Sequence, residues 1–127
     1  MIAGRRSTLL PFVRALAGTL VLVGVAAAAA PILDVGEAAP APIAQVLGRE
    51  KCHACHGLDE ARIGPAYRMI AARHRGGGAI MADVLARKII HGGAGNWGVV
   101  PMVANERVSL EEARRVARWI LALEPPS

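Results

Sequence analysis

Two cysteines and a histidine stand within five residues of one another, in the stretch Cys52-His53-Ala54-Cys55-His56. Two thiols three residues apart lie on one turn of backbone, where both can add to the two vinyl groups of one porphyrin ring. The histidine that follows is then carried beneath the ring, where an imidazole nitrogen can bind the iron. This C-x-x-C-H spacing is typical of c-type haem attachment. It predicts one covalent haem c, held by Cys52 and Cys55, with His56 as an iron ligand.

Two other kinds of site use a cysteine pair at this spacing: a thioredoxin-like redox pair and one half of a zinc site. A redox pair of that kind opens a helix after a strand, and no segment here alternates polar and apolar residues as a strand does. A structural zinc site needs four ligands, and the chain has no second cysteine pair. His74 and His91 would complete such a site only by coincidence. The sequence therefore favours a haem.

A six-coordinate iron needs a second ligand from the opposite face of the haem. The candidates are three methionines and three histidines: Met69, Met81, Met102, His53, His74 and His91. The first two methionines lie in helical patterns that favour core packing, and the histidines are expected to point away from the ring or into solvent. Met102 follows Pro101 in a glycine-rich loop, which can wrap a flat disc and present one side chain. Because thioether sulfur is a soft ligand that favours ferrous iron, Met102 is predicted to bind the iron.

The elements that must position these residues are all predicted to be helices. The expected ranges are 43–51, 66–75, 79–90 and a last helix that begins after Ser109. Pro42 suits the first turn of the first helix, and glycines at 76–78 and 92–93 end the second and third. No internal repeat is present, so the sequence predicts one all-α domain of about four helices.

The last helix has the strongest local signal. Ser109 is a helix N-cap, and Glu112 three residues later completes a capping box. Apolar residues then recur at helical spacing, namely Leu110, Ala113, Val116, Ala117, Ile120 and Leu121. Pro125 and Pro126 are expected to end the helix.

Four segments follow from composition along the chain. Residues 1–30 combine Arg5 and Arg6 with an apolar stretch and an alanine run, as in an export signal. Since residues 15–33 carry no charge, an uncleaved membrane anchor is the alternative. Residues 31–42 form a linker, 43–124 the domain and 125–127 a tail. Either interpretation of the N-terminus places the domain in the periplasm, with membrane attachment only if the segment is uncleaved.

Charge and composition exclude some functions. The chain of 127 residues has a net charge of +5, but three of its fifteen basic residues lie in the first fourteen positions. Beyond residue 30, twelve basic residues stand against ten acidic ones, which does not indicate a nucleic-acid binder. Only three aromatic residues lie in the domain, so its core is thin and a large apolar cofactor is expected to support it. The first and last helices are expected to cross near Gly48, with Trp119 over the contact.

From Lys51 onward the chain resembles the small bacterial class I monohaem cytochromes c, the short periplasmic type that donates electrons to nitrite reductases and terminal oxidases. The matching stretches are Cys52–His56, Ile63-Gly-Pro-Ala-Tyr-Arg68, Ile89–Met102 with its ending Gly-Asn-Trp-Gly-Val-Val-Pro-Met, and Ala117–Leu121. The resemblance implies a compact class I cytochrome c fold, about four helices wrapped around one covalently bound haem.

The resemblance also implies supporting roles, position by position. The Pro65 carbonyl would accept a hydrogen bond from the free ring nitrogen of His56. Trp97 would aim its indole N–H at a haem propionate, and Lys88 stands where the family often has an arginine near the propionates. Asn105 would donate a hydrogen bond to the sulfur of the methionine ligand.

The function implied is that of a periplasmic electron-transfer protein, a one-electron carrier and not an enzyme. Its partners would be redox proteins, a donor and an acceptor, with no nucleic acid among them. The alternative is a haem c subunit of a periplasmic dehydrogenase or oxidase complex. A free carrier usually has a docking patch of like charge, and because the charges of this domain look mixed in sequence, the subunit alternative stays open.

Overall fold

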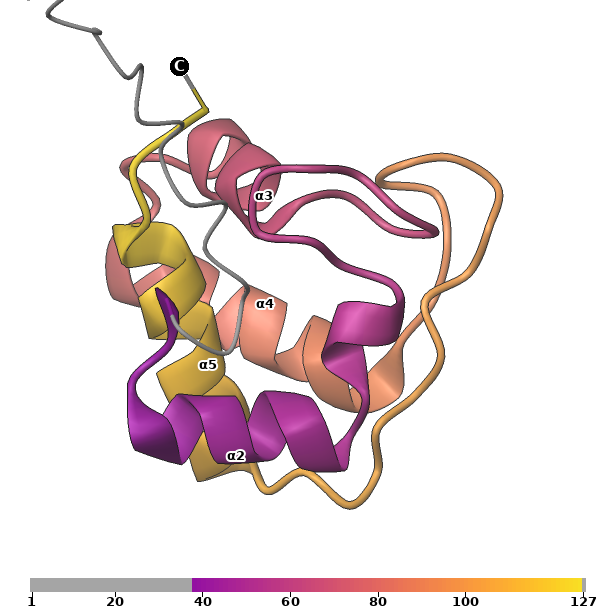
Figure 1. The fold of residues 1–127 in the computed structure, drawn as a ribbon, viewed down its shortest axis with the longest axis vertical. Coiled ribbons are helices and arrows are strands. Elements are labelled where there is room, and N and C mark those ends of the chain that lie inside the picture. The colour runs from indigo at the N-terminus through magenta and orange to yellow at the C-terminus, as the bar shows by residue number, and fades with distance from the viewer. Residues whose placement is uncertain (1–37, 127) are drawn as a thin grey trace, which may run out of the picture. The chain divides into compact units, whose positions relative to one another are not determined.

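The computed structural model describes residues 38–126, and Figure 1 shows their arrangement. The elements in chain order are α2 (Ala41–Arg49), the short 3₁₀ turn η1 (Cys52–Ala54), α3 (Tyr67–Arg73), α4 (Gly78–His91) and α5 (Leu110–Ala122). Over this range the only β contacts are two isolated bridges, so the prediction of an all-α fold is confirmed. The export signal expected at 1–30 lies outside the described residues.

The helices lie where the sequence places them, with small differences at their ends. α2 begins at Ala41, two residues earlier than expected, because the prolines on either side of this residue suit a helix start, where a missing N–H costs nothing. The end of the expected linker is therefore helical. α3 ends at Arg73, two residues early, as the chain turns through His74 toward Gly76, whose φ is +82°. α4 gains one residue at each end of its expected range.

The capping box of α5 is confirmed. The Ser109 hydroxyl accepts a hydrogen bond from the Glu112 backbone N–H at 3.2 Å, and the Ser109 N–H donates to the Glu112 carboxylate at 3.0 Å. The buried residues of the helix are four of those predicted from its periodicity, Ala113, Val116, Ala117 and Ile120. This helix contacts α2, α3 and α4, so it forms the centre of the fold.

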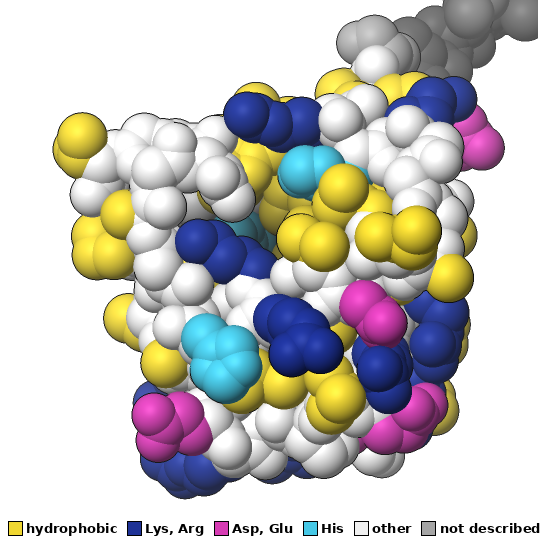
Figure 2. All heavy atoms as spheres, turned by 180° about the vertical axis from the view of Figure 1, so that it is seen from behind, with side chains coloured by type: hydrophobic (Ala, Val, Ile, Leu, Met, Phe, Trp, Pro, Cys, Tyr) yellow, Lys and Arg dark blue, Asp and Glu magenta, His cyan; other side chains and the backbone are white. Residues whose placement is uncertain are grey.

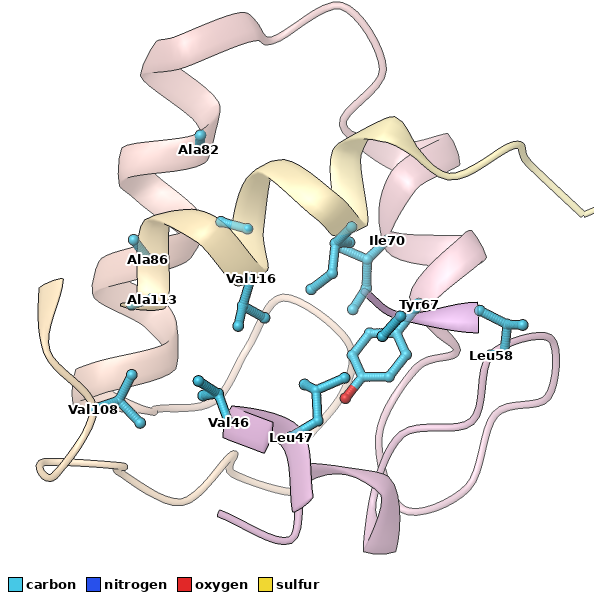
Figure 3. Close-up of a cluster of buried hydrophobic side chains, with 13 residues drawn as sticks. Val46, Leu47, Leu58, Tyr67, Ile70, Ala82, Ala86, Val108, Ala113 and Val116 are labelled. Atoms are coloured by element: carbon cyan, nitrogen blue, oxygen red, sulfur yellow. The ribbon is translucent and has the colours of Figure 1, made fainter. Parts of the chain in front are cut away.

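The core is thin, as the composition predicts. Figure 3 shows the buried cluster, in which Leu47 is the largest side chain that is fully buried. Alanines contribute much of the rest, including Ala82 and Ala86 of α4, which pack with α5 in the same cluster. Tyr67 contributes an aromatic ring, which meets the Trp119 ring edge to face at 5.3 Å.

The expected close approach at Gly48 is wrong. α2 does pack against α5, but it does so through the buried residues Val46 and Leu47. Gly48 lies on the exposed side of the helix, and a Cβ atom there would meet nothing within 4 Å. Trp119 of α5 packs on Tyr67 of α3, so its ring joins these two helices.

None of the described helices is long and apolar enough to cross a membrane.

Candidate functional site

A cavity of about 960 Å³ opens on one side of the helices, and Figure 2 shows it as a hollow with hydrophobic and basic side chains around its mouth. Its walls come from the end of α2 with the turn after it, the segment that leads into α3, one side of α4, and the loop between α4 and α5. All eight predicted site residues line this cavity: Cys52, Cys55, His56, Pro65, Lys88, Trp97, Met102 and Asn105.

The cysteines stand on a tight turn that directly follows α2. Lys51 has a left-handed backbone, with φ 54° and ψ 33°, and this reverses the chain into η1. The backbone N–H groups of Cys55 and His56 both donate to the Cys52 carbonyl, at 3.1 and 3.0 Å. Both thiols are therefore held on one turn and face the same cavity.

The Cys52 thiol does not have the electrostatic surroundings of an attacking redox cysteine. Both cysteines are free and partly buried, and burial raises the pKa of the Cys52 thiol. Thioredoxin-like pairs need an attacking cysteine whose pKa is lowered. Among the described residues, no three His, Cys, Asp or Glu side chains form a group that could hold a metal ion, as a structural zinc site would require.

The His56 ring is fixed from three sides. Its Nδ1 lies 2.7 Å from the Pro65 carbonyl oxygen, and because a carbonyl only accepts, Nδ1 carries the proton and Nε2 keeps its lone pair. Tyr67 stacks on the ring at 5.4 Å with 27° between the planes. Gly64 lies against the ring edge, where a Cβ atom would stand 2.5 Å from Cε1. The ring is therefore oriented, with one nitrogen available as a ligand.

Met102 stands at the neck of the loop between α4 and α5. Its backbone exchanges two hydrogen bonds with Gly93, at 2.9 and 3.0 Å. Gly92, with φ +66° and ψ −147°, lets the two chain segments meet, since a Cβ atom there would be 2.4 Å from the Met102 carbonyl oxygen. The neck thus fixes where the methionine leaves the backbone.

Asn105 joins the end of this loop to the last residues of α4. Its backbone N–H donates to the Ile90 carbonyl at 2.9 Å, and its side-chain amide donates to the carbonyls of Ile89 and Val103 at 3.0 and 3.2 Å. The amide nitrogen of Asn105 therefore has two carbonyl partners in this arrangement. The hydrogen bond from Asn105 to the Met102 sulfur stays a prediction.

Trp97 and Lys88 lie at the rim of the cavity. The Trp97 side chain is exposed, and the Arg73 guanidinium of α3 lies 4.6 Å above its ring in a cation–π contact. The Lys88 ammonium lies beside the loop neck, 3.0 Å from the place that a Cβ atom of Gly93 would occupy. Their contacts with haem propionates stay predictions.

Only some of the alternative iron ligands named from the sequence line the cavity. Met69, His74 and His91 line it together with Met102, whereas Met81 and His53 do not. Met81 instead packs against Gly77 at the start of α4.

Sequence reasoning missed three residues that shape the site. Gly64 and Gly92 permit close approaches between segments far apart along the chain, which no local pattern signals. The Tyr67 hydroxyl is buried on the cavity wall without a hydrogen-bond partner among the described residues. Burial raises the pKa of this hydroxyl, so it stays protonated and can donate.

These features fit a haem. The volume lies within the range of cofactor cavities, and such cavities are mostly apolar with a few placed polar groups. The cavity has two thiols on one turn, an oriented imidazole, and an unpartnered hydroxyl in its wall. The all-helical fold and this attachment turn define a c-type cytochrome.

No family model matches the chain. It is 40% identical over 87 residues to cytochrome c-551 of Allochromatium vinosum, covering 67% of this chain and 92% of that one. It is 42% identical over 79 residues to cytochrome c-551 of Pseudomonas aeruginosa, covering 61% and 74%. Among solved structures, it is similar to cytochrome c552 of Nitrosomonas europaea with a TM-score of 0.59 and 38% identity, covering 64% of this chain and 99% of that one. The chain belongs to the family of small monohaem cytochromes c-551 and c-552.

Proposed function

We propose that this protein is a periplasmic one-electron carrier whose single haem c is ligated by His56 and Met102. The observation that carries the proposal is that the Cys52–His56 turn and the Met102 neck line one cavity while being built from different segments. Membership in the cytochrome c-551 and c-552 family supports electron transfer, and a carrier is not an enzyme. The covalent haem c follows from the same membership, with Cys52 and Cys55 as the two attachment residues.

When bound, the haem supplies an iron that gains and loses one electron. The chain supplies the surroundings. The Pro65 carbonyl holds the proton of His56 at Nδ1, which leaves Nε2 as the donor and strengthens it. Met102 would supply the second protein ligand of the iron. An iron that binds both His56 and Met102 has no free coordination position for a substrate. This is why we assign an electron carrier and not an enzyme that reacts with a substrate at the iron.

The ligand assignment also fits the contacts that hold both residues in place. Electron transfer is favoured when little moves between the two oxidation states. His56 is held by a hydrogen bond, a stacked ring and a backbone approach, and Met102 by paired backbone hydrogen bonds. In the folded protein both residues are therefore held by the polypeptide as well as by the iron.

The test is production of the chain in the periplasm of cells that have haem-attachment machinery. We expect one haem to stay with the denatured polypeptide through acid–acetone extraction, and the N-terminus of the purified protein to begin near residue 31. A mass equal to that of the bare polypeptide would contradict the central proposal. A protein that keeps residues 1–30 and partitions with membranes would instead support the anchored alternative.

A further inference from the structure

The two ends of α3 contact the two segments that supply the proposed iron ligands. The helix begins at Tyr67, whose ring stacks on His56 with 5.4 Å between the ring centroids. It ends at Arg73, whose guanidinium carbon lies 4.6 Å from the centroid of the Trp97 ring. Trp97 belongs to the loop whose neck contains Met102. One short helix therefore connects the segment of one ligand with the segment of the other.

α3 is well suited to hold these segments at a fixed separation. Its residues Tyr67, Ile70 and Ala71 are buried, and the helix packs against α5. A hydrogen-bonded helix rises about 1.5 Å per residue, so the seven residues of α3 span about 10 Å. Because such a helix does not stretch, groups that contact its two ends keep their distance from each other.

The loop tip, residues 94–101, has few other attachments. Its one backbone hydrogen bond in the described structure is internal, from the Gly95 N–H to the Gly98 carbonyl at 3.1 Å. No side-chain hydrogen bond or ion pair within residues 38–126 involves the tip. In that range, the polar or aromatic contact that joins the tip to a helix is the one between Arg73 and Trp97.

The Arg73 guanidinium has no competing partner among the described residues. It forms no ion pair and no side-chain hydrogen bond there, whereas Arg114, for example, is bonded to Asp83 at 2.7 Å. A cation over the face of an indole ring is attracted by the negative charge of that face, and tryptophan is the best aromatic residue for this contact. The charge of Arg73 therefore acts on the loop tip through Trp97.

We propose that Arg73 is a positioning residue for Met102: through Trp97 it holds the loop tip against α3 and slows the opening of the loop. The inference rests on the proposed ligation of the iron by Met102. Once the tip leaves α3, the loop is held at its neck alone, by the paired hydrogen bonds between Gly93 and Met102. Movement of the neck then lets the methionine leave the iron. Arg73 thus controls how often a small molecule can reach the iron from the Met102 side.

The first experiment measures how fast imidazole replaces Met102 in the oxidised holoprotein, from the loss of the weak sulfur-to-iron absorption band. Imidazole binds after the methionine has left, so at high imidazole concentration the rate reaches a limit that loop opening sets. We expect Arg73→Gln to raise this limiting rate about twofold to fivefold, as expected for the loss of an exposed cation–π contact. Above about pH 8 imidazole is uncharged, so the lost positive charge does not change its attraction to the protein.

Two further variants show whether the effect belongs to this contact. Arg75→Gln is the matched control, because Arg75 is exposed, lies outside the cavity lining and has no ion pair in the described range. It should leave the limiting rate unchanged. Trp97→Leu should raise the rate by itself, and adding Arg73→Gln to it should cause no further rise. Equal effects of the two arginine changes, or the same effect of Arg73→Gln with and without Trp97, would overturn the proposal.

NMR spectra of the reduced wild-type holoprotein test the contact without a change to Arg73. Protons over the face of an aromatic ring are shifted upfield, so we expect the side-chain signals of Arg73 to lie upfield of those of Arg75 and to lose this shift in Trp97→Leu. Equal positions in the wild-type protein would overturn the proposal. An imidazole rate that rises without limit, in a protein without the sulfur-to-iron band, would overturn the ligation by Met102 as well. An unchanged limiting rate in Arg73→Gln would overturn the role of Arg73 alone.

Discussion

Gly93 and Met102 are joined by a pair of backbone hydrogen bonds, one in each direction, at 2.9 and 3.0 Å. The eight residues between them form a loop whose base is closed by the chain itself. The position of the proposed iron ligand is thus set by backbone geometry, and it does not depend on the side chain that occupies it. Substitutions of Met102 should therefore change ligation while leaving the loop in place.

Met102→Ala is the direct test of the ligand. We expect the oxidised holoprotein to lose the weak sulfur-to-iron band near the red end of the visible spectrum, and its reduction potential to fall, because methionine ligation raises it. Met69→Ala is the matched control, since Met69 also lines the cavity. Loss of the band in the control variant alone would contradict the assignment, and a bis-histidine spectrum would point to His74 or His91.

Gly92→Ala should open the loop neck. Its backbone conformation is one that only glycine adopts readily, and the added Cβ would meet the Met102 carbonyl oxygen at 2.4 Å. We expect the free energy of unfolding to fall by about 3 kcal/mol. Gly95→Ala has positive φ as well, +98°, but no atom within 4 Å of its Cβ, so it should cost only about 1–2 kcal/mol. Urea unfolding of both holoproteins measures the difference, and equal losses would show that the close approach is unimportant.

Gly64→Ala should displace the His56 ring. The added Cβ would lie 2.5 Å from Cε1 and 2.9 Å from Nδ1, so the bond to the Pro65 carbonyl must lengthen or tilt. We expect a loss of about 1–3 kcal/mol of stability and a shift of the His56 ring signals in NMR spectra of the reduced protein. Gly48→Ala is the control, because it adds the same methyl group in open space on a helix. It should stabilise the protein by about 0.5–1 kcal/mol.

Acid should weaken the cap of α5. The hydrogen bonds from Ser109 lower the pKa of Glu112 from 4.5 to about 2. A carboxylate with a lower pKa in the folded chain contributes stability above its ordinary pKa, and this is lost as the pH falls through the folded value. We expect the wild-type protein to lose more stability between about pH 5 and pH 2 than Glu112→Gln does. Glu111→Gln keeps the capping carboxylate and should follow the wild-type curve in urea unfolding.

Removal of the attachment residues should prevent folding. In Cys52→Ala plus Cys55→Ala the cavity of about 960 Å³ would have no covalently held ring to fill it. Ordering the backbone costs about 1–2 kcal/mol per residue, and a core in which Leu47 is the largest fully buried side chain offsets little of that cost. We expect circular dichroism of the variant to show a largely unfolded chain. Helix content and a cooperative melt equal to those of the holoprotein would contradict this.

The features that could be predicted from sequence are those that local chemistry determines. The start of α5 follows from Ser109 and Glu112, and the all-α fold follows from helical periodicity and glycine stops. The attachment turn could be predicted because its function needs five consecutive residues. Its position in the cavity could not, because the cavity is formed by segments far apart along the chain.

The close approaches between distant chain segments could not be predicted from the sequence. A glycine in a helix suggested contact at Gly48, where the structure has open space. Gly64 and Gly92 carry no such signal, yet each allows two distant segments to touch. Which glycine is needed depends on what lies opposite its missing side chain, and that is decided by tertiary packing. Ion pairs between helices, such as Asp83 of α4 with Arg114 of α5 at 2.7 Å, have the same origin, since they depend on which helix faces meet.

The alanines between α4 and α5 limit which amino-acid substitutions the protein can accept at this contact. Ala86 and Ala113 have no exposed surface, and Figure 3 shows them where the two helices meet. A larger side chain at either position would overfill the contact, at about 1–3 kcal/mol. Glycine, the smaller choice, would cost about 1 kcal/mol in helix propensity. Each position is therefore almost closed to single substitutions, and the pair can change only if both helices move apart together, whereas the arginines on the outer faces are open to replacement.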